Sequence, residues 1–430
     1  MNICIFTLGS RGDVQPYLAL AKELMQSGHT ATICTGSSFQ MLIESQGIPF
    51  VEVSADFMAL AKTSEGKAVL EHPLCNFRKV LFLSKYVLEP AYQKTLRTFF
   101  SAAKNADCII YHPKALGAVD IALYYDIPCI SMPLAPIAYP IKEFPNPILT
   151  TKNLGSFLNR LSYQINGLAE HSQMNAINDF RIKVLSQKPR KAGLYTRHMK
   201  TQNIPIIYPF SRSLFPEVKS WNDHVFLSGF FYLKEENSDL PDKLQNFLNS
   251  GPRPIAVTFS SMPLKSPDRF LSNLKTALKK SNNRAVLLSG NSGMRAADDA
   301  HLCVLPELSH QQLFSHVKAV IHHGGAGTTA AALRAGLPQL IIPFSADQPF
   351  WAKRMQLLGV GLHLNCERSC TAKLLTRLLL QLNTPERLEK ALLIADKIRV
   401  EHGTETAVRE IEFLLHPLQH SAARISHTPQ

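Results

Sequence analysis

The feature that most constrains the fold is an alternation of short apolar runs with amphipathic helical segments, in both halves of the chain. Residues 3–8 form an apolar run, a glycine-containing turn follows, and residues 17–26 carry apolar side chains at helical spacing before the run at 30–35. The same order recurs at 107–132 and from 255 to 343. Strands that alternate with helices form parallel sheets covered by helices. We therefore predict an α/β protein with doubly wound, Rossmann-like parallel sheets.

The length of the chain predicts two domains rather than one. Its 430 residues exceed the roughly 250 to 300 residues at which a single core stops growing. We expect one doubly wound domain at 1–215 and another at 235–394, facing each other across a cleft. A helix at about 395–415 is expected to rejoin the first domain, and residues 416–430 to form a loose tail.

Charge and cysteine content restrict the class of protein. The chain has 46 Lys and Arg against 33 Asp and Glu, a net charge of +13, which favours an anionic partner such as a phosphate-bearing ligand, nucleic acid or a membrane. Its eight cysteines show neither zinc spacing nor a disulfide framework. We find neither a secretory signal nor an apolar run long enough to span a bilayer. These features predict a cytoplasmic protein, with membrane association left open.

The strongest local signal is the glycine-rich segment His322 to Thr329, which follows an apolar run and opens a helical segment. In a turn of this kind a ligand can approach the backbone, and the free amides and positive end of the helix favour a phosphate. The alternative is that the glycines serve only tight packing. Asp347 and Gln348 follow the next apolar run, so they fall at the carboxyl end of a neighbouring strand, where open α/β sheets bind ligands. Together these segments suggest a sugar phosphate ligand.

These motifs resemble the donor-binding signature of the family 1 glycosyltransferases, which have the two-domain GT-B fold. The resemblance is carried by His322 to Thr329, Arg334 to Pro338 and the pair Asp347-Gln348, in that order. It is strongest toward the sterol glucosyltransferases, with the antibiotic and rhamnolipid transferases nearby. The segments Gly9 to Pro16 and Val257 to Met262 match the same group, so the resemblance extends over both domains.

The resemblance implies that the second domain binds a nucleotide-sugar donor and the first an acceptor. It assigns these residues to donor binding: Ser261, His310, His322, Gly324, Gly325, Ala326, Gly327, Thr328, Thr329, Asp347 and Gln348. The segment 304–312 would border the nucleobase, and because it lacks the tryptophan of many plant relatives, uridine and thymidine both stay open. A helix end and a histidine would neutralise the diphosphate, so no metal and no further cofactor are expected.

Asp13 is the catalytic base that the resemblance implies. It lies in the glycine turn formed by Gly9, Ser10, Arg11 and Gly12, directly after the first predicted strand. Inverting transfer needs one base to accept the proton of the acceptor hydroxyl. The alternative is that Asp13 only caps the following helix, because aspartate is a favoured residue at helix starts.

Two further observations concern the acceptor side. The segment Arg181 to Lys200 has seven Lys and Arg and no acid, which predicts either a solvated face or a surface that docks on anionic lipid. The apolar segments 73–100 and 133–147 are ordinary core by pattern alone, but the resemblance implies that they wall the acceptor pocket. Because no nucleic-acid-binding motif accompanies the charge, we expect no nucleic-acid partner.

The function implied is an inverting, metal-independent hexosyltransferase that moves glucose from UDP-glucose to a hydroxyl of an apolar, sterol-like or lipidic acceptor. One alternative is a transferase of a secondary metabolite, or of a rhamnosyl-type glycolipid, that uses a dTDP-sugar. Another is a non-catalytic GT-B accessory protein. A nucleotide-sugar epimerase shares the fold, but the acceptor-side segments argue against it.

Overall fold

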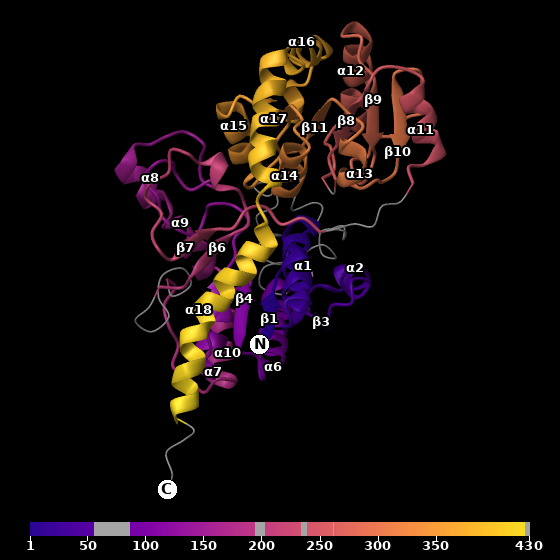
Figure 1. Ribbon diagram of the computed structural model, residues 1–430. Helices are drawn as coiled ribbons and strands as arrows, with labels where there is room; N and C mark the ends of the chain where they lie inside the picture. The colour runs from indigo at the N-terminus through magenta and orange to yellow at the C-terminus, as the bar shows by residue number, and fades with distance from the viewer. Residues whose placement is uncertain (56–86, 194–202, 234–238, 261, 426–430) are drawn as a thin grey trace.

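The structure is a computed structural model of the chain, and it describes residues 1–55, 87–193, 203–233, 239–260 and 262–425. Two parallel sheets, each covered by helices, form the two halves of the molecule (Figure 1). This confirms the predicted α/β class with two doubly wound domains.

The first sheet has seven strands in the order β3-β2-β1-β4-β5-β6-β7. They are β1 (Asn2–Phe6), β2 (Thr30–Thr35), β3 (Phe50–Glu52), β4 (Cys108–Tyr111), β5 (Cys129–Ser131), β6 (Ile206–Tyr208) and β7 (Val225–Leu227). Side chains that alternate along β1 enter different cores, with Ile3 and Ile5 on one face of the sheet and Phe6 on the other. Because β7 belongs to this sheet, the first unit continues past residue 215.

Helices cover both faces of the first sheet. The helices that precede β6 in the chain are α1 (Arg11–Gln26), α2 (Gln40–Glu44), α6 (Glu89–Ala102), α7 (Ala118–Tyr125), α8 (Ser156–Ser162), α9 (Ile165–His171) and α10 (Met174–Lys183). Helix α1 buries Val14, Leu18, Ala21 and Leu24, whose spacing places them on one face, and this face packs on β1 and β2. The first turn of α1 is thereby fixed at the carboxyl end of β1.

The second sheet has six strands in the order β10-β9-β8-β11-β12-β13. They are β8 (Ile255–Thr258), β9 (Ala285–Leu288), β10 (Leu302–Leu305), β11 (Ala319–His322), β12 (Gln339–Ile341) and β13 (Gly361–His363). Its helices are α11 (Asp242–Asn249), α12 (Pro267–Lys280), α13 (His310–Phe314), α14 (Ala326–Arg334), α15 (Gln348–Leu357), α16 (Ala372–Leu382) and α17 (Pro385–Arg399). Short 3₁₀ helices lie at Ser37–Phe39, Arg212–Leu214 and Glu367–Ser369.

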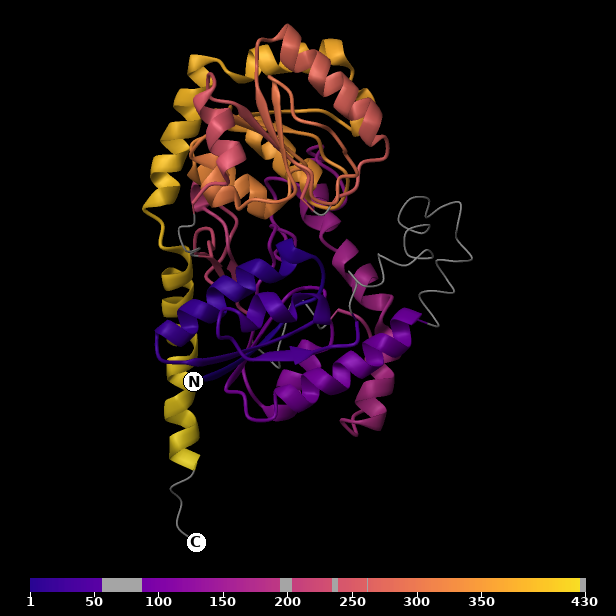
Figure 2. The same cartoon turned by 90° about the vertical axis from the view of Figure 1, so that its right-hand side faces the viewer.

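The last helix, α18 (Gly403–Ile425), returns to the first unit and runs along it (Figures 1 and 2). Val408 and Ile411 join the core beneath α1, and His29 Nε2 lies 2.8 Å from Glu412 Oε1. Two helices separated at residues 400–402 thus replace the single helix expected at about 395–415. Helix α18 also continues to Ile425, so the first part of the expected loose tail is helical, and Pro417 lies inside the helix.

The chain crosses between the domains twice, first after β7 and again between α17 and α18, and the two crossing segments lie against each other. Gly403, at the start of α18, is packed so closely on the first crossing that an added Cβ would lie 2.3 Å from the carbonyl oxygen of Phe230. A shared aromatic core adds to this contact, with the ring of Phe144 from the first unit 5.2 Å from that of Phe350 on α15. The glycine and the aromatic contacts hold the two sheets in a defined relation.

Among the described residues, no helix is long and apolar enough to cross a membrane.

Candidate active site

Each sheet has one point at which its strand order reverses, and the predicted site residues lie at both. In the first sheet the chain leaves β1 toward β2 on one side and later returns to β4 on the other; in the second sheet β8 and β11 are related in the same way. At such a switch point the loops diverge and leave a crevice at the carboxyl ends of the strands. Asp13 follows β1, and the segment His322 to Thr329 begins at the last residue of β11.

The Asp13 carboxylate uses its two oxygens for different purposes. Oδ2 accepts hydrogen bonds from the backbone N–H of Ser10 at 2.7 Å and from its hydroxyl at 3.0 Å, which completes the start of α1. Oδ1 lies 2.9 Å from Lys114 Nζ and 3.3 Å from His112 Nε2. Asp13 therefore takes part in capping while its other oxygen faces two groups at the end of β4.

Gly9 is required for this arrangement. Its φ of +140° is unfavourable for residues with a side chain, and an added Cβ would lie 2.2 Å from Asp13 Oδ2. The glycine turn therefore lets the backbone approach the carboxylate.

The surroundings of Asp13 favour its ionised form. Burial alone would raise the pKa of Asp13, but the Lys114 ammonium and the His112 imidazole outweigh it and hold this pKa well below its usual range. Burial lowers the pKa of His112, although Asp13 opposes the shift. The backbone N–H of Lys114 donates to His112 Nδ1 at 3.0 Å, so a neutral His112 carries its proton on Nε2 and can donate to Asp13.

On the opposite wall, the segment after β11 forms a turn into α14. Gly324 has a φ of +88°, and an added Cβ would lie 2.7 Å from the side chain of Ile341. Gly325 precedes the first residue of α14, so the amides of Ala326, Gly327 and Thr328 have no acceptor within the helix. Around Gly327 the space is open, because no described atom beyond its chain neighbours and its own helix backbone lies within 4 Å of its ideal Cβ position. This end of α14 can receive an anion.

The two adjacent histidines differ in their surroundings. His322 is fully buried; its Nδ1 accepts from the Gly324 N–H at 3.1 Å and its Nε2 lies 2.9 Å from Gln339 Oε1. Burial lowers the pKa of His322 to about 3, so it is neutral and both its nitrogens are occupied. His323 is 8% exposed, and its Nδ1 has no partner among the described residues. Burial lowers its pKa to about 4.

Asp347 and Gln348 begin α15 beside this loop. Gln348 Oε1 accepts from the backbone N–H of Phe344 at 2.8 Å, and Asp347 Oδ2 accepts from Trp351 Nε1 at 2.8 Å. Burial raises the pKa of Asp347, and the charge of Asp13 in the other domain raises it further. The carboxylates of the two walls are therefore within electrostatic reach of each other.

His310 lies at the start of α13, where its ring stacks on Phe314 with centroids 4.8 Å apart. Burial lowers its pKa to about 4, and Arg11 of the first domain contributes to the shift. His310 also lowers the pKa of His323. The structure thus brings His310, the loop after β11 and the glycine turn toward one region.

Two protein families match the chain, one in each half. Residues 3–119 match the glycosyltransferase family 28 N-terminal domain, and residues 302–412 match the erythromycin biosynthesis protein CIII-like C-terminal domain. The sterol 3-beta-glucosyltransferase UGT80A2 of Arabidopsis thaliana is 33% identical over 374 residues, which cover 84% of this chain and 57% of that protein. A sterol 3-beta-glucosyltransferase of Yarrowia lipolytica (strain CLIB 122 / E 150) is 31% identical over 437 residues, 96% of this chain and 28% of that protein.

The chain resembles the sterol glucosyltransferases and has the GT-B fold. It spans only 57% and 28% of the lengths of these two relatives. The fold is shared with a solved glycotransferase of kitacinnamycin, with a TM-score of 0.70, 18% identity and coverage of 96% of this chain and 99% of that one. The glycosyltransferase SsfS6 of Streptomyces sp. SF2575, solved with thymidine diphosphate, gives a TM-score of 0.58 at 16% identity, with the same coverage.

Within this GT-B frame, the predicted residues differ in their surroundings. His322 shapes the loop and points neither nitrogen outward, whereas the neighbouring His323 has a free one. Ser261 and residues 56–86 lie outside the described part of the chain. From the proline-rich segment 133–147, Ile141 is buried and Phe144 packs against the core between the domains.

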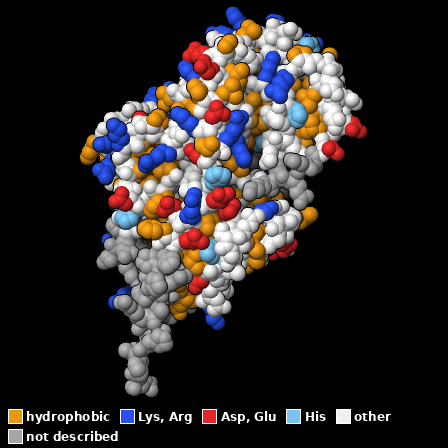
Figure 3. Space-filling view, viewed as in Figure 1, with side chains coloured by type: hydrophobic (Ala, Val, Ile, Leu, Met, Phe, Trp, Pro, Cys, Tyr) orange, Lys and Arg blue, Asp and Glu red, His pale blue; other side chains and the backbone are white. Residues whose placement is uncertain are grey.

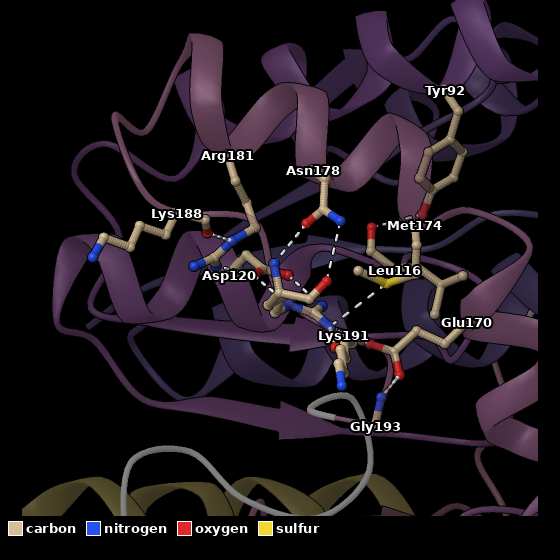
Figure 4. Close-up of polar contacts among 11 residues, drawn as sticks. Tyr92, Leu116, Asp120, Glu170, Met174, Asn178, Arg181, Lys188, Lys191 and Gly193 are labelled. Carbon is tan, nitrogen blue, oxygen red and sulfur yellow. Dashed lines mark hydrogen bonds and ion pairs between the residues drawn. The ribbon is translucent and has the colours of Figure 1, made fainter.

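The structure places the described basic residues of the segment Arg181 to Lys200 in two different environments. Arg181 and Arg190, each 13% exposed, both turn inward to the fully buried Asp120, and Arg190 also pairs with Glu170 at 2.7 Å (Figure 4). Lys188 and Lys191 point away from this cluster in the same view. Two of the seven basic residues thus serve internal pairing, and Arg197 and Lys200 lie outside the described residues.

The sequence interpretation missed His112 and Lys114. They follow an apolar run as Asp347 does, and β4 lies next to β1 in register, with Phe6 opposite Tyr111. A search for polar residues after every predicted strand would have found them, but the pairing of β1 with β4 is a property of the folded sheet.

Among the described residues, no cluster of three or more His, Cys, Asp or Glu side chains is arranged to hold a metal ion.

Proposed function

We propose that this chain is an inverting glycosyltransferase that moves a hexose, glucose from UDP-glucose first, to a hydroxyl of an apolar, sterol-like or lipidic acceptor. The single observation that supports this most is the placement of an ionised carboxylate, Asp13, at one switch point and an anion-receiving helix end, α14, at the other. The charge of Asp13 reaches Asp347 across the two domains. A base and a leaving-group site on facing walls are what transfer between two bound molecules requires.

In this proposal the diphosphate lies at the amino end of α14. Its oxygens would accept from the amides of Ala326 to Thr328, with His323 Nδ1 available beside them. The hydroxyl of Thr329, buried and unpartnered among the described residues, offers one further polar atom in this loop. Neutralisation by amides and a helix end would let the diphosphate leave without a metal ion.

Asp347 and Gln348 would bind the sugar hydroxyls, and His310 would border the nucleobase. Each is partly occupied within the protein, since Asp347 accepts from Trp351 and Gln348 from Phe344. These internal bonds orient the side chains before the donor arrives, which reduces the entropy lost on binding.

Asp13 would act as the general base. The acceptor oxygen forms a bond to the anomeric carbon, the bond from that carbon to the diphosphate breaks, and the nucleoside diphosphate leaves with the electron pair. The proton of the acceptor hydroxyl passes to Asp13 Oδ1. The Lys114 ammonium contacts Oδ1 in this structure. We infer that the acceptor hydroxyl displaces this ammonium, which raises the pKa of Asp13 toward the range of an effective general base.

The relatives support a sterol acceptor, because those described above are sterol 3-beta-glucosyltransferases. A dTDP-sugar is the alternative donor, since the structural neighbour SsfS6 was solved with thymidine diphosphate. The half-buried ring of His310, which stacks on the buried Phe314, offers a stacking surface that either base could use.

A donor and acceptor panel tests the proposal. The protein is incubated with UDP- and dTDP-sugars, first alone to measure hydrolysis and then with sterols, hydroxy-lipids and flavonoids in detergent. We expect glucose transfer from UDP-glucose to a sterol. Transfer only from a dTDP-sugar would support the alternative donor, whereas no hydrolysis and no transfer with any donor would favour a non-catalytic protein.

A further inference from the structure

Helix α8 has its polarity reversed. It exposes Phe157 (78%), Leu158 and Leu161 while it buries Asn159 and Ser162. A helix on the surface of a soluble domain normally does the opposite, with its apolar side chains toward the core. The exposed apolar side of α8 is therefore a candidate contact surface.

Hydrogen bonds fix this orientation. Asn159 Nδ2 donates to the carbonyl of Lys142 at 2.9 Å, and Asn159 Oδ1 accepts from the Leu154 N–H at 2.9 Å. Ser162 Oγ accepts from the Asn146 N–H at 2.7 Å. Rotation of α8 to cover Phe157 would leave these buried polar groups without partners, which costs free energy. The exposure of the apolar side is thus built into the fold.

The apolar surface extends beyond the helix. Among the described residues, seven of the nineteen exposed large apolar side chains fall within residues 148–168. They are Ile148, Leu149, Leu154, Phe157, Leu158, Leu161 and Leu168. Single exposed apolar residues are normal, but a concentration of this kind indicates a contact surface.

The charge beside this surface indicates the kind of partner. Lys142, Lys152 and Arg160 are exposed, and none has a carboxylate ion-pair partner among the described residues. Residues 144–169 contain no Asp or Glu. In Figure 3, hydrophobic and basic side chains lie beside each other at the left-hand edge, where Figure 1 places α8. Apolar side chains with flanking cations match an anionic bilayer, in which the cations meet the headgroups and the apolar groups enter below them.

We propose that α8 and the turn at 148–154 form a membrane-docking surface that inserts Phe157, Leu158 and Leu161 into an anionic lipid surface. The surface lies in the connection between β5 and β6, which leaves the first sheet at the same carboxyl edge as Asp13. A lipidic acceptor would thus reach the protein on the side of the proposed base. Docking itself does not depend on the proposed chemistry.

Vesicle flotation tests the docking surface without substrate. The full chain is mixed with sterol-free vesicles of phosphatidylcholine, or of phosphatidylcholine and phosphatidylserine, and the bound fraction is measured. We expect binding to the anionic vesicles, weakened by salt, and a loss on the order of tenfold or more in the partition coefficient for Phe157→Gln combined with Leu161→Gln. Phe413→Gln is the matched control, because Phe413 is 71% exposed on α18; it should bind as the wild type does.

Charge reversal provides the second arm. Lys152→Glu combined with Arg160→Glu should weaken binding to the anionic vesicles and leave the weaker binding to neutral vesicles unchanged. The proposal is overturned if the wild type binds neither kind of vesicle. It is also overturned if the double variant Phe157→Gln/Leu161→Gln binds as well as Phe413→Gln. A different outcome is that the wild type does not bind vesicles but forms a concentration-dependent dimer in sedimentation. If only the double variant Phe157→Gln/Leu161→Gln abolished that dimer, the surface would belong to a contact with a second copy of the chain. Because sugar transfer to an acceptor in detergent needs no vesicle, failure here is distinguishable from failure of the proposed function.

Discussion

At the residue scale, the glycines of the loop after β11 differ in what a side chain would meet. Gly324 has a positive φ and an ideal Cβ position that overlaps Ile341, so its lack of a side chain serves the fold. Gly327 has an ordinary helical conformation in α14 and open space at its Cβ position. Glycine inside a helix is unfavourable, so a reason outside folding is needed at Gly327. Close approach of the diphosphate, as proposed above, would supply that reason.

Alanine at these two positions should therefore have opposite effects. Gly324→Ala should lower the free energy of unfolding by roughly 1–3 kcal/mol, because it combines a strained φ with a clash. Gly327→Ala should raise it by about 0.5–1 kcal/mol, because alanine is the better helix former, yet weaken donor binding. Urea denaturation and calorimetric titration with UDP check both. If Gly327→Ala bound UDP as tightly as the wild type, the diphosphate would not lie against this turn.

At the element scale, the packing of α7 against α10 depends on a buried ion cluster. Asp120 on α7 is fully buried and accepts from Arg190 through two hydrogen bonds, at 2.8 and 2.7 Å, in addition to its contact with Arg181 on α10. Glu170 on α9 also pairs with Arg190. Three helices are thereby tied to the segment that follows α10, and the cluster stabilises the first unit only while its charges remain paired.

Removal of Arg190 should destabilise the first unit strongly. We expect Arg190→Met to lower the free energy of unfolding by about 3–5 kcal/mol, because Asp120 and Glu170 both lose a buried cationic partner and Asp120 keeps only Arg181. Lys191→Met removes the same charge from the next, exposed residue and should change stability by less than about 0.5 kcal/mol. Thermal and urea unfolding followed by circular dichroism provides the comparison. Similar losses in the two variants would mean that the cluster is not what holds α7, α9 and α10 together.

At the scale of the whole molecule, the fold was predictable and parts of the site were not. Runs such as 3–8 and 255–259 are short, apolar and followed by helical spacing, so local pattern is enough to indicate two parallel sheets. The pairing of Asp13 with His112 depends on which strand lies beside β1, and the inward turn of Arg190 depends on Asp120, 70 residues away. Local pattern contains neither fact. The exposure of Phe157 could not be predicted from local pattern either, because the buried hydrogen bonds of Asn159 set the orientation of α8.

The rate of the Asp13→Asn variant tests whether a base and a donor site lie on facing domains. Asparagine keeps the shape of the side chain and an oxygen that can accept from Ser10, so α1 should stay capped while the base is lost. Glucose transfer from UDP-glucose to a sterol in detergent should fall by about 10²–10⁴-fold in kcat, with UDP affinity unchanged. Asp179→Asn, a similar change on the exposed face of α10, should transfer at the wild-type rate. Near-normal transfer by Asp13→Asn would contradict the account.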